Sequence, residues 1–312
     1  MDTGFAPERG KVGMWPEGAA YLDGRFMPLA EAKIPITDWG YRRSDVTYDV
    51  VSVWDGAFFR LPDHLARFRR ARNELRLKPD EDDAAIRAIL HELVRRTGLK
   101  RAYVAMDCLR ARPPKGVPFS PLNARSYLLA FACPYVWLFA PEVIERGIHA
   151  IVAKTPRVPP ESIDPTVKNF NWGDLTRALF EAADAGADTA ILVDRDGFVT
   201  EGPGYNVFAI RDGRVVNPDR GALEGITRKS VHELCDELGI PLEVRKLPIE
   251  ELRDADEILF ATTAGGVMPV PRLDGRIYGN DRPGPLSARL RERYWARRAE
   301  GWHAEPVEYG EG

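Results

Sequence analysis

Alternating hydrophobic and polar positions fill the first part of the chain, interrupted by two stretches with helical spacing. Tyr21–Phe26 predicts a hairpin, because Asp23-Gly24 suits a tight two-residue turn. The first helix is expected to be capped by Asp63, and the second to end at Gly98. The expected elements are helices over 64–75 and from Asp80 or Asp82 to about Thr97, and strands over 47–53, 57–59, 101–109 and 126–132.

The second part of the chain predicts a meander of strands with separate helices. Asp196-Gly197 and Asp212-Gly213 mark two hairpin turns, and Gly239 ends a helix. The expected strands are 147–155, 189–193, 198–200, 205–210, 214–216, 242–246 and 257–262, and the helices are 173–185, 227–238 and 286–298. Helices that gather apart from mostly antiparallel strands predict an α+β fold. We expect a small N-terminal domain over 1–135, a linker over 136–146 and a larger C-terminal domain over 147–312.

Composition narrows the function classes. The 312 residues carry a net charge of -3, so no basic field favours nucleic acid or an anionic membrane. No apolar run reaches the roughly 20 residues of a membrane span. Three distant cysteines and five histidines without paired spacing predict reduced thiols, a cytoplasmic location and no metal site. These features leave small-molecule chemistry as the expected function.

Lys168 is the first candidate for that chemistry. It lies among the apolar residues Val167, Phe170 and Trp172, just before a predicted helix. A lysine that forms a covalent imine needs a fixed position and a lowered pKa, which an apolar pocket supplies. The alternative is an exposed loop lysine, which only agreement with other residues argues against.

Three stretches downstream supply that agreement. Glu201 follows a strand and precedes a glycine-shaped turn, where a carboxylate could pair with a pyridine nitrogen. Gly225-Ile226-Thr227 opens a helix whose free N–H groups form an anion site, with the Thr227 hydroxyl as a helix cap. Thr262-Thr263 precedes a glycine loop and offers hydroxyls to the same anion. Singly, each is equally typical of an ordinary turn or cap. Together they suit pyridoxal 5′-phosphate.

These stretches, with the segments 44–56, 172–175 and 262–269, resemble the fold-type IV pyridoxal-phosphate enzymes, the class IV aminotransferases. The similarity extends from about Tyr21 to Tyr294. Within this group the chain is most similar to the (R)-selective amine transaminases, and it is related to branched-chain and D-amino-acid aminotransferases. The resemblance implies a homodimer that transfers an amino group from an (R)-amine or D-amino acid to a keto acid such as pyruvate.

The resemblance also implies a role for each matching residue. Lys168 would bind the cofactor and carry the proton, Glu201 would pair with the ring nitrogen, and Leu223 would pack on the ring. Phosphate would be held by Arg67, by the N–H groups of Ile226 and Thr227, and by Thr262 and Thr263. Tyr48 and Trp172 would stand at the substrate pocket.

Two departures from the family pattern concern the substrate. Trp172 stands where branched-chain enzymes usually have a tyrosine, which weakens that reading. The segment after 108 differs from the amine transaminases, so a basic residue there could bind a substrate carboxylate: Arg110, Arg112, Lys115 or Arg125. Arg43 is another candidate, because amine transaminases tend to have a smaller or neutral group at that position. An L-branched-chain aminotransferase, an aminodeoxychorismate lyase and a non-catalytic binding protein remain alternatives.

Overall fold

The computed structural model describes residues 9–310, which form two compact units. The first unit contains the described residues up to Val136, the short segment Val167–Phe170 and the described residues from His303 onward. The second contains Trp137–Thr166 and Asn171–Trp302. Two pieces that are distant in sequence therefore join the first unit, which differs from a single cut at residues 136–146. One of those pieces carries Lys168.

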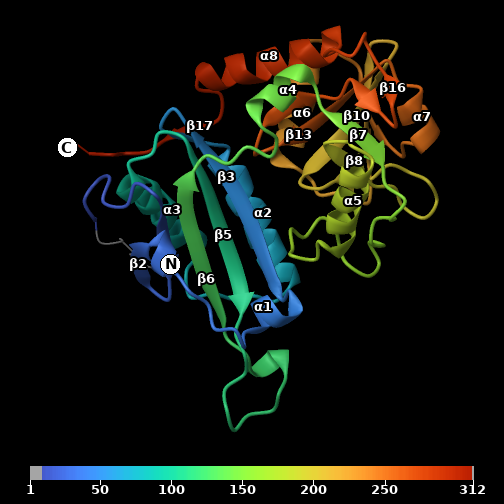
Figure 1. The fold of residues 1–312 in the computed structure, drawn as a ribbon. Coiled ribbons are helices and arrows are strands. Elements are labelled where there is room, and N and C mark those ends of the chain that lie inside the picture. Colours follow the sequence, from blue (N-terminus) through green and yellow to red (C-terminus); the bar gives the residue numbers. More distant parts are fainter. Residues whose placement is uncertain (1–8, 311–312) are drawn as a thin grey trace. The chain divides into compact units, whose positions relative to one another are not determined.

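A seven-stranded sheet forms the base of the first unit, in the order β17-β4-β3-β5-β6-β1-β2. Its long strands β3, β5 and β6 lie side by side and pair antiparallel (Figure 1). The expected hairpin is present, with Tyr21 opposite Phe26. The strands are β1 (Ala19–Leu22), β2 (Arg25–Pro28), β3 (Val46–Trp54), β4 (Ala57–Phe59), β5 (Ala102–Arg110), β6 (Ser126–Pro134) and β17 (Ala304–Pro306).

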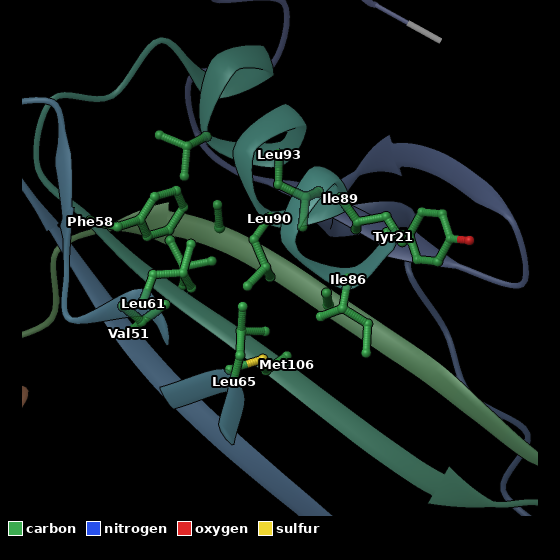
Figure 2. Close-up of a cluster of buried hydrophobic side chains, with 14 of the residues drawn as sticks. Tyr21, Val51, Phe58, Leu61, Leu65, Ile86, Ile89, Leu90, Leu93 and Met106 are labelled. Carbon is green, nitrogen blue, oxygen red and sulfur yellow. The ribbon is translucent and has the colours of Figure 1, made fainter. Parts of the chain in front are cut away.

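The core of the first unit lies on one face of this sheet, under α2 (Leu61–Glu74) and α3 (Asp83–Thr97). Side chains of α3 point toward the strands, where Val51 and Met106 meet them (Figure 2). Val51 and Met106 are both completely buried. Since side chains alternate along a strand, the residues next to Val51 in β3 and next to Met106 in β5 point to the opposite face of the sheet. The remaining short helices of this unit are α1 (Trp39–Arg43), η1 (Leu29–Glu31) and η2 (Pro121–Asn123).

The starts of the two long helices differ in how well the sequence predicted them. Asp82 caps α3, accepting a hydrogen bond from Ala85 N at 2.8 Å, and Gly98 ends it with φ +71°. The prediction that Asp63 caps α2 was wrong, because α2 begins at Leu61, with Arg60 in the left-handed region before it. Asp63 lies inside the first turn and binds Arg60 Nε at 2.6 Å.

A six-stranded sheet organises the second unit, in the order β12-β11-β10-β13-β14, with β9 paired to β10. The hairpin between β10 and β11 turns at Asp212-Gly213, as expected, with positive φ at both residues. Helices α6 and α8 pack against β13 and β14. The strands are β9 (Glu201–Gly202), β10 (Tyr205–Arg211), β11 (Arg214–Pro218), β12 (Leu242–Arg245), β13 (Glu257–Thr262) and β14 (Gly266–Pro269).

The rest of the second unit corrects the expected meander. The strand starting at Thr189 lies in a separate four-stranded sheet, β16-β15-β7-β8, where it runs parallel to its neighbour. Residues 198–200 form no strand, although a bridge joins Val193 to Val199 and backbone hydrogen bonds join Asp194 to Phe198 and Thr200 to Leu192. The four strands are β7 (His149–Val152), β8 (Thr189–Ile191), β15 (Arg272–Leu273) and β16 (Arg276–Ile277).

Helices of the second unit include one that the sequence placed in a linker. Residues 141–146 form α4, since Pro141 suits the first turn of a helix. None of the helices in residues 9–310 is long and apolar enough to cross a membrane. The helices are α4 (Pro141–Arg146), α5 (Gly173–Asp184), α6 (Ile226–Glu237), α7 (Ile249–Arg253) and α8 (Pro285–Ala299).

Candidate active site

In the first unit, the backbone of Lys168 is fixed to the open edge of β3. Strand β4 pairs only with Val53 and Trp54, so the earlier residues of β3 lack a partner on that side. The Lys168 carbonyl accepts hydrogen bonds there from Tyr48 N at 3.2 Å and from Thr47 Oγ1 at 2.7 Å. The segment around Lys168 therefore continues the sheet, and the lysine cannot drift from β3 without breaking these bonds.

The side chain of Lys168 lies over an aromatic surface. Its Nζ is 4.3 Å from the centroid of the Tyr48 ring, a cation–π distance. The Phe170 ring lies 4.9 Å from the same tyrosine. Lys168 and Tyr48 are both half-buried. The structure thus brings together the predicted imine lysine and the predicted pocket tyrosine, with the amine held against the ring.

A buried ionic cluster lies on the other, helix-covered face of β3. Arg67 binds Asp49 through Nε at 2.7 Å and Nη2 at 2.8 Å, and His64 Nδ1 lies 2.8 Å from the same carboxylate. Burial alone would raise the pKa of Asp49, but the charges and hydrogen bonds of Arg67 and His64 together outweigh it and hold the pKa below its usual range. Burial lowers the pKa of His64, so its neutral ring donates from Nδ1 to the ionised Asp49. The cluster fixes the guanidinium of Arg67.

In the second unit, Glu201 is clamped by three hydrogen bonds. Arg157 donates to its Oε1 from Nε at 3.1 Å and from Nη2 at 3.0 Å, and the Leu223 N–H donates to Oε2 at 2.9 Å. Arg157 also binds Asp174 at 2.6 Å. Burial alone would lower the pKa of Arg157, but the Glu201 and Asp174 charges raise it. A cation that keeps its proton beside Glu201 favours the carboxylate form that a ring-nitrogen partner requires.

The start of α6 is built around an asparagine. Asn206 lies opposite Glu201 in β10 and donates to the Leu223 carbonyl at 2.8 Å. A Cβ on Gly225 would come within 2.0 Å of Asn206 Oδ1, so only glycine fits before the helix. The N–H groups of Ile226 and Thr227 belong to the first helical turn, which has no intrahelical acceptor for them.

Thr227 does not cap α6, which corrects the sequence expectation. The capping position is Gly225, and it makes no side-chain cap bond. Thr227 is 3% exposed, and its hydroxyl finds no hydrogen-bond partner among residues 9–310. A hydroxyl at a helix start that the described residues leave without a partner is suited to an anion.

The threonine loop follows the neighbouring strand. Asn206 of β10 lies opposite Glu201 of β9 on one side and opposite Ala261 of β13 on the other. Thr262 is the next residue after Ala261. Thr262 is buried, and its Oγ1 accepts from Ala264 N at 3.4 Å. Gly266 has φ +73°, and a Cβ there would meet the Tyr294 ring at 2.7 Å. Thr262 and Thr263 thus lie at the end of β13, which pairs with β10, and β10 in turn pairs with the strand that carries Glu201.

Comparison with known proteins identifies this arrangement. The family model for Amino-transferase class IV matches residues 47–273. The chain belongs to the class IV aminotransferases. It is therefore a transaminase that depends on pyridoxal phosphate. The fold is fold-type IV, as the sequence predicted.

Relatives of two specificities resemble this class IV enzyme. A putative branched-chain-amino-acid aminotransferase of Methanocaldococcus jannaschii is 31% identical over 278 residues, covering 88% of this chain and 94% of that protein. A D-alanine aminotransferase of Staphylococcus haemolyticus is 28% identical, covering 87% of this chain and 95% of that protein. A solved T.th. branched-chain amino acid aminotransferase with pyridoxamine 5′-phosphate matches with TM-score 0.86 and 29% identity, over 94% of this chain and 100% of that one.

The described residues fit the cofactor of this family. The unpartnered Thr227 hydroxyl and the glycine-only start of α6 suit its phosphate, and the clamped Glu201 suits its ring nitrogen. In the first unit, Lys168 presents an amine over Tyr48. Each unit therefore carries one part of the predicted residue set.

The residues predicted to contact the substrate lie in different places. Trp172, in the second unit, precedes α5 and lies near Gly204, in the turn after Glu201. Arg43 stacks on Trp39 at 3.9 Å and reaches Phe119 at 5.2 Å, where Arg112 lies 5.7 Å from the ring. Arg43 and Arg112 thus share one aromatic side chain.

Arg110 occupies a different place from these two. It follows the helix-covered side of β5, where Nε binds Asp45 at 2.7 Å and Nη2 binds the Leu75 carbonyl at 2.7 Å. The structure therefore does not bring Arg110 to the Tyr48 face. Lys115 is exposed, and the exposed Arg125 pairs with Asp23 at 3.0 Å.

Several residues of these clusters were missed in the sequence. Asp49, His64, Arg157 and Asn206 stand in no motif that names their partners, because each contact joins distant segments. Strand alternation could have placed Asp49 toward α2, and the spacing of His64 and Arg67 could have placed both on one helix face. For Arg157 and Asn206 no such local signal exists.

Proposed function

We propose that this class IV aminotransferase moves an amino group from an (R)-amine or D-amino acid to an α-keto acid such as pyruvate, with Lys168 as the catalytic residue. The observation that carries the proposal is the position of Lys168, whose backbone is fixed to β3 and whose Nζ rests over Tyr48. A fixed amine beside an aromatic surface can bind an aldehyde and transfer a proton at one defined atom.

The cofactor supplies, when bound, an aldehyde for Lys168 and a protonated ring that withdraws electrons. Lys168 Nζ takes the proton from the donor Cα and returns it within the same half-reaction. Glu201, which Arg157 binds through two hydrogen bonds, would accept the hydrogen bond from the ring nitrogen. Ile226, Thr227, Thr262 and Thr263 would hold the phosphate, and Leu223 would pack on the ring. Arg67, to which the resemblance gives a phosphate role, binds Asp49 on the helix-covered face of β3. The acceptor half-reaction uses the same residues in reverse.

The composition of the Tyr48 face supports an amine donor. Its other residues on β3, β5 and β6 follow from the strand register, and these three strands contribute no arginine or lysine to it. Tyr103 and Phe131 lie on this face with their rings 6.2 Å apart and stacked. An aromatic face to which these three strands bring no cation suits an amine that has no α-carboxylate. The (R) handedness rests on the resemblance to the amine transaminases.

A donor–acceptor matrix tests this proposal. The purified enzyme should be yellow, and (R)-1-phenylethylamine should bleach its visible band faster than the (S) enantiomer does. D-Alanine serves as the carboxylate-bearing donor. If it is used, Arg43→Ala and Arg112→Ala should lower its kcat/KM and leave that of the amine unchanged.

A second candidate follows from the relatives. The matched structures include branched-chain aminotransferases at TM-score 0.86, so an L-branched-chain donor is the competing assignment. L-Leucine with 2-oxoglutarate is its diagnostic pair. Turnover of this pair above that of (R)-1-phenylethylamine with pyruvate would replace the amine assignment.

The assembly and location are further parts of the proposal. We propose a homodimer in the cytoplasm that binds small donors and acceptors. Light scattering at micromolar concentration measures the assembly directly, with a mass twice the 35.0 kDa of the chain expected.

A further inference from the structure

Asp107 stands beside the proposed catalytic lysine. It lies in β5 directly opposite Tyr48 of β3, so both side chains belong to the same face of the sheet. Opposite residues of an antiparallel pair have Cα atoms about 5 Å apart. Lys168 Nζ lies over the Tyr48 ring. Asp107 is therefore the direct cross-strand neighbour of the tyrosine that contacts the reactive amine.

The carboxyl of Asp107 has no partner. It is 9% exposed, yet it makes no hydrogen bond or ion pair with any residue from 9 to 310. Burial raises the pKa of Asp107 to about 7, with no nearby charge to offset it. A carboxyl that receives no donor from the described residues is able to accept a hydrogen bond from a ligand. One core cluster of the first unit uses the opposite face, and a second apolar cluster, which includes Val46 and Leu109, packs on the face of Asp107. Neither cluster supplies a hydrogen-bond donor to the carboxyl.

We propose that Asp107 is a specificity-determining residue that accepts a hydrogen bond from a hydroxyl or ammonium group on the side chain of the amine donor. The inference rests on the proposed function and names its substrate class: amino alcohols and diamines, in preference to plain alkyl amines. A carboxylate only accepts hydrogen bonds, so the matching group on the substrate is a donor. The same charge repels a substrate carboxylate, because like charges in a buried site interact strongly.

Matched donors test this assignment. In (R)-3-aminobutan-1-ol a hydroxyl replaces the terminal methyl of (R)-2-aminopentane, and bleaching of the cofactor band measures kcat/KM for each, with both enantiomers run. We expect the alcohol to be preferred by roughly tenfold or more, and this ratio to fall to about one or below in Asp107→Leu. Asp107→Asn keeps the shape and should give a smaller loss. Leu129→Met, at the cross-strand neighbour of Asp107, should change kcat/KM for both donors by the same factor.

A pH profile separates recognition from a structural role. For 1,3-diaminobutane relative to 2-aminopentane, the ratio of kcat/KM should fall as pH drops through about 7, because a protonated Asp107 loses its charge. Asp107→Asn should abolish that step. Burial raises the pKa of Tyr103 and Cys133 on the same face, so neither titrates there. Of the charged side chains on elements around this face, Lys168 lies over Tyr48 and Arg43 of α1 stacks on Trp39, and neither offsets the effect of burial on the pKa of Asp107.

The outcomes distinguish two failures. Bleaching by amines with the same donor ratio and pH profile in wild type and both Asp107 variants overturns this inference alone. No bleaching by any amine contradicts the proposed function and removes the inference with it.

Discussion

Two buried aspartates on opposite faces of one sheet differ in their partners and in the direction of their pKa shifts. Asp49 faces the helices, binds Arg67 and His64, and has a pKa below its usual range. The Asp107 carboxyl faces the other way and has no partner among residues 9–310, and burial raises its pKa to about 7. They lie on adjacent strands, and both are buried, Asp49 completely and Asp107 with 9% of its surface exposed. Partners, not burial, therefore set their charge.

The difference separates groups that serve the fold from groups that serve a ligand. Asp49 and Glu201 receive the hydrogen bonds described above from their own units, so removing those donors should cost stability or misplace the carboxylate. Asp107 and the Thr227 hydroxyl receive none, so removing them should cost recognition and spare stability. The predictions below test this division.

The largest effect is expected at Lys168, on the face that carries Asp107. Lys168→Ala should lower turnover roughly 10⁴-fold or more, as removal of a catalytic group does. The backbone bonds to Tyr48 and Thr47 use the Lys168 carbonyl, so thermal stability should stay close to that of wild type. Steady-state kinetics and a melting curve measure the two. Exposed Lys154→Ala is the control, with both properties unchanged. Residual turnover near the wild-type level would remove Lys168 from the chemistry.

Loss of Asp49 should be the largest effect on stability. Asp49→Ala leaves Arg67 buried without its counter-ion, which costs about 3–5 kcal/mol of unfolding free energy. Urea unfolding of the apoenzyme measures it. Asp107→Ala is the matched control on the other face, and its cost should be below about 1 kcal/mol. An equal loss of unfolding free energy in Asp49→Ala and Asp107→Ala would contradict the claim that one face serves the fold and the other a ligand.

Thr227 tests the unpartnered class in the second unit. Thr227→Val keeps the shape and removes the hydroxyl, so we expect cofactor affinity to weaken about tenfold, the effect of one lost hydrogen bond to a charged group. Apoenzyme stability should stay within about 0.5 kcal/mol. Ser230→Ala on the same helix, whose hydroxyl donates to the Ile226 carbonyl, serves as the control and should leave affinity unchanged. Fluorescence titration with pyridoxal phosphate gives both affinities. Unchanged affinity in Thr227→Val would exclude the hydroxyl from the anion site.

The smallest effect concerns pH. The folded state lowers the pKa of His64, so the unfolded chain takes up a proton first as pH falls below about 6.5, and stability is lost. Its slope should not exceed about 1.4 kcal/mol per pH unit. The lowered pKa of Asp49 adds a further loss below about pH 4. His64→Gln should flatten the curve between pH 7 and 5 in urea unfolding. An unaltered curve would mean that His64 is not buried in its neutral form.

The sequence predicted those parts of the fold and site that depend on local pattern. The Asp23-Gly24 hairpin, the Asp82 cap and the glycine end of α3 follow from backbone preference alone. Parallel pairing of β7 with β8 could not be read, because it joins strands separated by a helix and the register depends on tertiary packing. Arg157 was missed for the same reason, since its pairing with Glu201 spans 44 residues.

Register also explains what happened at Arg110 and Asp107. The sequence proposed Arg110 for the pocket from its charge, but its place in β5 turns it to the helix-covered face, toward Asp45. Asp107, three positions earlier, points to the face that carries Tyr48. Only the pairing of β3 with β5 decides which of them can meet a substrate, and that pairing lies outside local pattern.

Borohydride reduction of the holoenzyme tests the central claim most directly. The reagent fixes the cofactor on whichever lysine holds it, and trypsin no longer cleaves at that residue. We predict one labelled peptide, Val158–Arg177, with the tag on Lys168 and none in Lys168→Ala. A tag on another lysine, or no tag at all, would contradict the account.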